Sequence, residues 1–216
     1  SFISQMLFPS SPAIQLRIWL EQMKEYTENP DIDGLIIDLG SVKGGLAKKN
    51  EMRRALQTFK DSGKEIIVYS EYGITTGGYF LTAMADKIFI SGSTGIDLNG
   101  INVEISFYRG LLDTLSIVPE VFRVNYDGKS YKTAGDPFLN RSMSDEMQEN
   151  YTDLFQSIYD IMVSGISEGR GWSIEETKNI MNEGPYMILA DAKKTGIIDS
   201  IMYTDQFEEY IKNLND

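Results

Sequence analysis

The sequence contains no cysteine and no histidine among its 216 residues. These two absences exclude a Ser-His-Asp triad, a cysteine nucleophile, and any metal site built from thiolate or imidazole ligands. If the chain takes part in hydrolysis, the base must therefore be a lysine or a carboxylate. A lysine serves as a base only where burial or a neighbouring cation lowers its pKa from about 10.4 towards neutrality.

Basic side chains are also scarce, since 20 lysines and arginines face 32 acidic residues and give a net charge of −12. This balance argues against a nucleic-acid partner and against binding to an anionic membrane surface. No apolar run reaches the length of about 18 residues that a membrane-spanning helix needs. The opening residues lack the regions of a signal peptide, and a chain that begins without Met is expected to be a fragment of a longer protein.

The remaining pattern predicts one α/β domain over residues 1–216, with a mostly parallel sheet and covering helices. Short apolar runs predict strands at Gly34–Leu39, Glu65–Ser70, Lys87–Ser91, Glu120–Val124 and Ile197–Met202. The first of these runs is expected to be buried on both faces. Helical periodicity predicts helices at Pro12–Asn29, from Asn50 to Gly63, and at Tyr79–Ala85, Glu104–Leu115, Ser144–Glu168, Ala190–Thr195 and from Thr204, with a capping box at Ser173–Glu176.

Lys132 is the first candidate for chemistry, because it lies in the Gly- and Tyr-rich segment 127–138, DGKSYKTAGDPF. Taken by itself, it is typical of a solvated loop lysine beside Lys129. A catalytic role requires desolvation, which local sequence does not establish. Ser130, Tyr131 and Asp136 are the neighbours that would orient it, and the sequence leaves the choice among them open.

Two glycine-containing turns are further candidates. Thr76 and Gly77 lie between a predicted strand and a predicted helix, where backbone N–H groups and the helix dipole favour developing negative charge. The alternative is that Thr76 only caps the helix. Gly44 and Gly45 follow the first strand and would present backbone N–H groups as an oxyanion hole, or simply form a tight turn.

Several segments in order resemble the signal peptide peptidase A family, also called protease IV. The resemblance rests on residues 76–88, TGGYFLTAMADKI, on the lysine segment from Phe122 to Phe138, and on residues 190–199, ADAKKTGIID. It extends from about Asp31 to the C-terminus, and the lysine segment is its most specific part.

The resemblance implies a crotonase/caseinolytic-protease-like fold and a Ser/Lys dyad peptidase that needs no cofactor and no metal. It also implies a ring-like homo-oligomer at the cell envelope that degrades cleaved signal peptides. This oligomer would be anchored in the inner membrane by a segment outside this chain. In that family a serine attacks the peptide carbonyl and a neutral lysine takes the hydroxyl proton. The lysine position corresponds to Lys132. Gly44, Gly45 and Gly77, noted above for their turns, are the candidates for oxyanion or substrate binding.

The sequence departs from the family pattern at the nucleophile. Single-domain members have a serine where this chain has Thr76, and residues 97–101, DLNGI, also differ from their pattern. Both departures resemble the N-terminal half of the long, duplicated members, in which one half gives the lysine and the other gives the serine. The chain is therefore expected to supply Lys132 as general base, to receive the serine from the C-terminal half of the same protein, and to be inactive alone.

Three alternatives remain open at this point. A self-sufficient hydrolase would use Thr76 as nucleophile with Lys132, although threonine nucleophiles are best known with an N-terminal amine as base. A non-catalytic assembly domain would use its apolar helices and 12 tyrosines as an interaction surface. An acyl-CoA enzyme of the same fold would bind coenzyme A, which the acidic balance and the lysine segment do not favour.

Overall fold

The computed structural model describes residues 14–125 and 127–214, so the first residues of the helix predicted from Pro12 lie outside the described part. The backbone contacts divide the chain into two compact units. The first, which we call the sheet unit, comprises Ser1–Asn99 and Val163–Asp216, and the second, the lysine unit, comprises Gly100–Met162. Each unit is described by itself, and the expectation of one domain over the whole chain stays a prediction.

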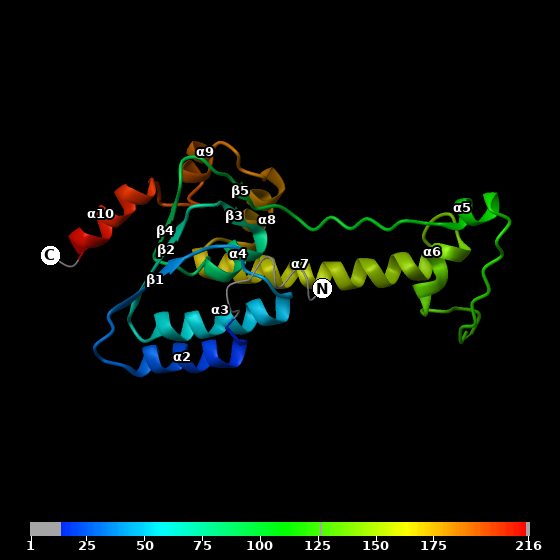
Figure 1. Cartoon of the computed structure of the whole chain (residues 1–216), viewed down its shortest axis with the longest axis horizontal. Helices are drawn as coiled ribbons and strands as arrows, with labels where there is room; N and C mark the ends of the chain where they lie inside the picture. The colour runs from blue at the N-terminus through cyan, green and yellow to red at the C-terminus, as the bar shows by residue number, and fades with distance from the viewer. Residues whose placement is uncertain (1–13, 126, 215–216) are drawn as a thin grey trace, which may run out of the picture. The chain divides into compact units, whose positions relative to one another are not determined.

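The sheet unit is built on a parallel sheet of four strands in the order β1-β2-β4-β6 (Figure 1). These strands are β1 (Gly34–Asp38), β2 (Glu65–Ser70), β4 (Lys87–Ile90) and β6 (Ser200–Ile201). Two short strands, β3 (Ile74–Thr75) and β5 (Ile96–Asp97), form a separate parallel pair. The predicted parallel sheet with covering helices is therefore confirmed.

Helices cover both faces of this sheet. On one face, Phe207 of α10 (Thr204–Leu214) stacks on Tyr69 of β2 with ring centroids 4.4 Å apart and also packs on Phe89 of β4. Alternate residues of the same strands point to the other face of the sheet. Buried side chains of two further helices lie on that face. These helices, α2 (Leu16–Glu28) and α3 (Leu46–Asp61), pack side by side (Figure 1).

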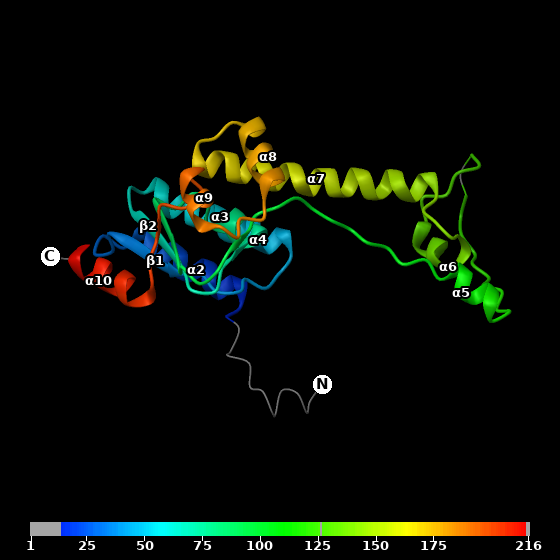
Figure 2. The same ribbon diagram turned by 90° about the horizontal axis from the view of Figure 1, so that it is seen from above.

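Glycines let the end of the long helix α7 (Asp145–Arg170) approach α4 (Thr76–Thr82) closely. A Cβ on Gly165 would lie 2.4 Å from Cε2 of Phe80. Arg53 of α3 donates a hydrogen bond of 2.8 Å to the carbonyl of Gly165, which fixes the same helix end. Figure 2 shows α8 (Ile174–Glu183) beside this end of α7, followed by α9 (Leu189–Lys194).

The lysine unit contains little regular structure besides the first part of α7. It holds α5 (Arg109–Thr114), the 3-10 helix η1 (Thr133–Gly135) and α6 (Asp136–Leu139). The rings of Tyr108 and Phe138 stack with centroids 5.7 Å apart, and the Tyr108 N–H donates to the Pro137 carbonyl at 2.7 Å. These contacts join α5 to α6.

Two predictions about strands were wrong. The run Gly34–Leu39 is not buried on both faces, because β1 is the edge strand of the sheet and Ile36 is 49% exposed. The run Glu120–Val124 forms no strand, because it has no ladder partner among the described residues. An apolar run alone therefore does not fix burial or strand formation, because both depend on pairing with neighbouring strands.

Three helix starts also differ from prediction. α3 begins at Leu46 after Gly45, so Asn50 lies inside the helix and does not cap it. α4 begins at Thr76 rather than Tyr79, and only α5 forms within the predicted helix Glu104–Leu115. The capping box at Ser173 is confirmed, with both of its hydrogen bonds to Glu176 present, and so is the helix α7 that begins after Ser144.

Candidate active site

Thr75 and Thr76 have different roles at the start of α4. Thr75 is the N-cap, and its Oγ1 accepts a hydrogen bond of 3.2 Å from the Gly78 N–H. The reading of Thr76 as the cap was therefore wrong by one residue. Thr76 is the first residue of the helix, and its side chain is directed to another segment.

The Thr76 hydroxyl is bound to the loop that follows β5. Oγ1 donates to the Asp97 carbonyl at 2.7 Å and accepts from the Asn99 N–H at 3.1 Å. Further acceptors on Asn99 lie at 3.2 and 3.3 Å, but a hydroxyl has only one proton to donate. A nucleophile must give that proton to a base, whereas this one already holds a loop in place.

Gly77 lies beside a lysine that sequence analysis did not single out. A Cβ on Gly77 would lie 2.4 Å from Nζ of Lys49, so a larger residue here would displace the lysine. Lys49 stands in the first turn of α3, the helix capped by Gly45. The preceding Gly44 has a φ of +132°, which L-residues rarely adopt, and both Gly44 and Gly45 are exposed.

Lys132 lies in the lysine unit, directly before η1. Its side chain is exposed, and its ammonium makes no hydrogen bond or ion pair with the described residues. The residues on either side are held more firmly. Asn150 of α7 donates to the Tyr131 carbonyl at 3.2 Å, and Thr133 is buried.

The three candidate orienting residues of Lys132 differ in their surroundings. Ser130 donates to the Val124 carbonyl at 2.9 Å. The exposed Tyr131 hydroxyl donates to Glu149 at 2.9 Å, and this hydrogen bond to a carboxylate raises the pKa of Tyr131 above its ordinary value. Asp136 alone is fully buried, and it accepts hydrogen bonds from Arg123 and Ser144.

The structure thus places the predicted site residues in two groups. Gly44, Gly45, Thr76 and Gly77 belong to the sheet unit, and Lys132 belongs to the lysine unit. Lys49, Arg123 and Ser144 were missed, because no local pattern reveals that a side chain meets a glycine or a carboxylate from a distant segment.

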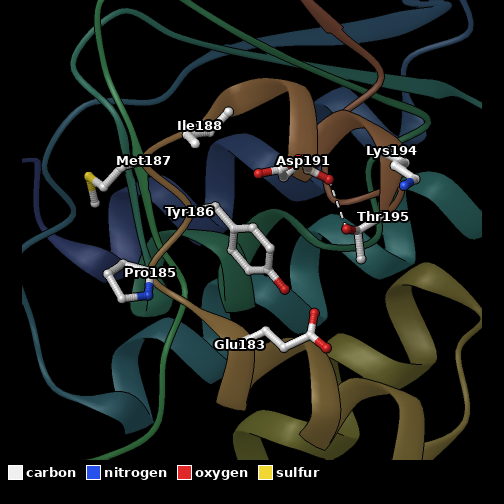
Figure 3. Close-up of a pocket in the computed structure, with 8 residues that line it drawn as sticks. All are labelled: Glu183, Pro185, Tyr186, Met187, Ile188, Asp191, Lys194 and Thr195. Carbon is white, nitrogen blue, oxygen red and sulfur yellow. Dashed lines mark hydrogen bonds between the residues drawn. The ribbon is translucent and has the colours of Figure 1, made fainter.

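A separate hollow of about 570 Å³ lies in the sheet unit and contains none of the predicted site residues (Figure 3). It is lined by the segment between α8 and α9 and by residues of both helices, including Tyr186, Glu183 and Asp191. The Tyr186 hydroxyl donates to the Ile180 carbonyl at 2.8 Å, so the ring supports the wall of the hollow. No cluster of acidic side chains that would hold a metal ion exists among residues 14–125 and 127–214.

The parallel β-α-β crossovers and covering helices of the sheet unit define an α/β protein of the crotonase/caseinolytic-protease-like class. Comparison with known proteins agrees with this class: the family model described as Peptidase family S49 matches residues 58–216. The chain therefore belongs to peptidase family S49.

Curated relatives extend this result. The chain is 33% identical over 185 residues to "Serine protease SPPA, chloroplastic" of Arabidopsis thaliana and 30% identical over 173 residues to "Protease 4" of Haemophilus influenzae. These matches cover 85% and 80% of the chain but only 26% and 27% of the relatives. A "Putative signal peptide peptidase SppA" of Enterococcus faecium is 25% identical over 201 residues, which cover 90% of the chain and 54% of that protein.

The chain thus spans about a quarter of the length of the first two relatives and about half of the third. Within the described part of the chain, no helix has both the length and the apolar character needed to cross a membrane.

Proposed function

We propose that this chain is the lysine-donating domain of a Ser/Lys-dyad signal peptide peptidase and is inactive alone. Lys132 is the general base, and the nucleophilic serine comes from another domain of the same protein. The observation that carries the proposal is the contrast between two side chains. The Lys132 ammonium is free among the described residues, whereas the Thr76 hydroxyl at the nucleophile position donates its proton to the Asp97 carbonyl.

The reaction follows from these roles. The serine hydroxyl of the other domain attacks the peptide carbonyl while the neutral Lys132 amine takes its proton. The resulting ammonium then gives that proton to the leaving amine, and a water molecule hydrolyses the acyl-enzyme. Gly44, Gly45 and Gly77 are the candidates for backbone N–H groups that bind the peptide, because a glycine lets another backbone approach closely.

The surface next to Lys132 supports a covering domain. Phe122 and Val124 are 94% and 80% exposed, on an extended segment without a strand partner among the described residues. Exposed apolar side chains beside unpaired backbone are typical of surfaces that another protein segment covers. Such a cover would also remove water from around the lysine, as a neutral amine base requires.

The substrates, the assembly and the location are part of the same proposal. Membership of a peptidase family and the name of one relative, a putative signal peptide peptidase, support signal peptides as substrates. Cleaved signal peptides are the proposed form of the substrate, and the cell envelope is the proposed location. The C-terminal half of the same protein is the proposed partner, and a homo-oligomer is the proposed assembly. We propose no cofactor, because a lysine and a hydroxyl suffice for the steps above.

The exposed apolar side chains also favour a second candidate, a non-catalytic assembly domain. In that case the chain would shape a substrate cavity without supplying any reacting group. The two candidates differ in what they require of Lys132: the first needs its amine, and the second does not.

The test is peptide hydrolysis by the chain alone and by the chain mixed with the remaining part of its longer protein. We expect activity only in the mixture, and we expect Lys132→Ala to abolish it. Lys129→Ala, which removes another exposed lysine of the same segment, is the matched control and should keep activity. Activity of the unmixed chain would contradict the proposal, and an active Lys132→Ala mixture would favour the assembly domain.

A further inference from the structure

The carboxylate of Asp136 is the meeting point of three segments in the lysine unit. Its side chain is 0% exposed. Oδ1 accepts a hydrogen bond of 2.6 Å from Nη1 of Arg123, which lies in the extended segment before the lysine loop. Oδ2 accepts from the hydroxyl of Ser144, which in turn accepts from the Met147 N–H at 3.2 Å and so begins α7.

A buried carboxylate of this kind fixes geometry because it is costly to leave unpaired. Removing one partner of a buried ion pair is strongly unfavourable, since the remaining charge has no water to solvate it. Arg123 and Ser144 must therefore stay in place together, on opposite oxygens of one rigid group. Packing adds to this, because a Cβ on Gly135 would lie 2.8 Å from Cγ1 of Val121, so the extended segment is pressed against η1.

Lys132 differs from Asp136 in exposure and in hydrogen bonding. Its side chain is exposed and makes no hydrogen bond or ion pair with the described residues, so nothing at the amine itself sets its position. The backbone of Lys132 runs directly into η1, whose first residue, Thr133, is buried, and then into Asp136. The residues that follow Lys132 consequently set the direction in which its side chain extends.

We propose that Asp136, held by Arg123, is the positioning residue of Lys132. Its buried ion pair fixes the turn from which the amine reaches the serine of the other domain. The inference rests on the proposed function and adds a residue to it. Three neighbours of Lys132 were candidates from the sequence. Ser130 and Tyr131 make exposed hydrogen bonds, to the Val124 carbonyl and to Glu149, whereas Asp136 joins the lysine turn to two other segments.

The test uses the longer protein with Asp136→Asn, which keeps the shape of the side chain and removes its charge. We expect kcat to fall about 10- to 100-fold, because a misplacement of a reacting group by about 1 Å costs up to about 100-fold. KM should stay within about twofold, since the substrate contacts are unchanged. Arg123→Met should show the same loss, and Arg123→Lys, which restores a cation, should recover most of it.

A matched control is Arg141→Met. Arg141 forms an exposed ion pair of 2.6 Å with Asp113 in the same unit and does not touch Asp136, so kcat should stay within about twofold. If Asp136→Asn does not fold, the comparison of Arg123→Met with Arg123→Lys carries the test. In the chain alone, amide hydrogen exchange over residues 131–139 should accelerate in Arg123→Met and not in Arg141→Met.

Failure of this inference can be told from failure of the proposed function. An inactive Lys132→Ala together with an Asp136→Asn variant of normal kcat would overturn the positioning role and leave the base in place. A rise in KM with kcat unchanged would also overturn it, because that result assigns Asp136 to substrate binding. An active Lys132→Ala would overturn the proposed function, and the positioning role would fall with it.

Discussion

Replacing Thr76 with valine keeps the branched shape of the side chain and removes the hydroxyl. The variant loses the hydrogen bonds to the Asp97 carbonyl and from the Asn99 N–H, at 2.7 and 3.1 Å. Each such bond contributes about 0.5–1.5 kcal/mol net, and Asn99 is only half-buried, so the free energy of unfolding should fall by about 2 kcal/mol. For a chain of this size that corresponds to a drop of roughly 4–8 °C in the unfolding midpoint.

The measurement is urea denaturation of the chain, with Thr58→Val as the control. Thr58 also donates its hydroxyl to a backbone carbonyl, that of Arg54, but it is exposed on α3, so its change should stay within about 0.5 kcal/mol. An unchanged stability of Thr76→Val would refute the structural role of the hydroxyl. So would a loss of peptidase activity of more than about 100-fold in the longer protein at 20 °C, because that loss is what removal of a nucleophile produces.

Three further changes test other parts of the structure. Gly165→Ala should lower the free energy of unfolding by about 1–3 kcal/mol, because the added Cβ would overpack against Phe80 of α4. Gly110→Ala is the control, since a Cβ there would meet no other group within 4 Å, and differential scanning calorimetry would detect the difference. Ser173→Ala should cost about 1 kcal/mol in urea denaturation because it removes the capping box of α8, and an unchanged midpoint would contradict that. Burial raises the pKa of Tyr79, whose hydroxyl donates to the Ile197 carbonyl. The contribution of this hydroxyl to stability is therefore present below about pH 10 and is lost as the pH rises further. Tyr79→Phe should weaken the decline in stability between about pH 10 and 11, and an identical decline would refute this.

The regular elements could be predicted where local chemistry decides them. The capping box at Ser173 and the long periodic helix α7 depend on neighbours three or four residues away, and both are as predicted. The start of α3 could not be predicted in this way. It begins at Leu46, after Gly45, which offers no side-chain cap, whereas Asn50, the residue with a suitable side chain, lies within the helix.

The candidate site shows the same limit more strongly. Lys132 and its segment were identified by their resemblance to a family motif, but the pairing of Asp136 with Arg123 joins residues 13 positions apart across a loop. Gly77 was noted for its turn, whereas its contact with Lys49 depends on how α3 packs on α4. Ion pairs and close approaches of this kind follow from tertiary packing, which no local pattern specifies.

The role of Lys132 as general base is tested by comparing Lys132→Ala with Lys129→Ala in the longer protein. Both changes remove one exposed lysine from the same segment, but only the first removes the proposed base. We expect Lys132→Ala to lower kcat for a signal-peptide substrate by at least about 1,000-fold, whereas Lys129→Ala should stay within about twofold. Peptide hydrolysis by Lys132→Ala at the rate of the unchanged protein would show that Lys132 is not the base.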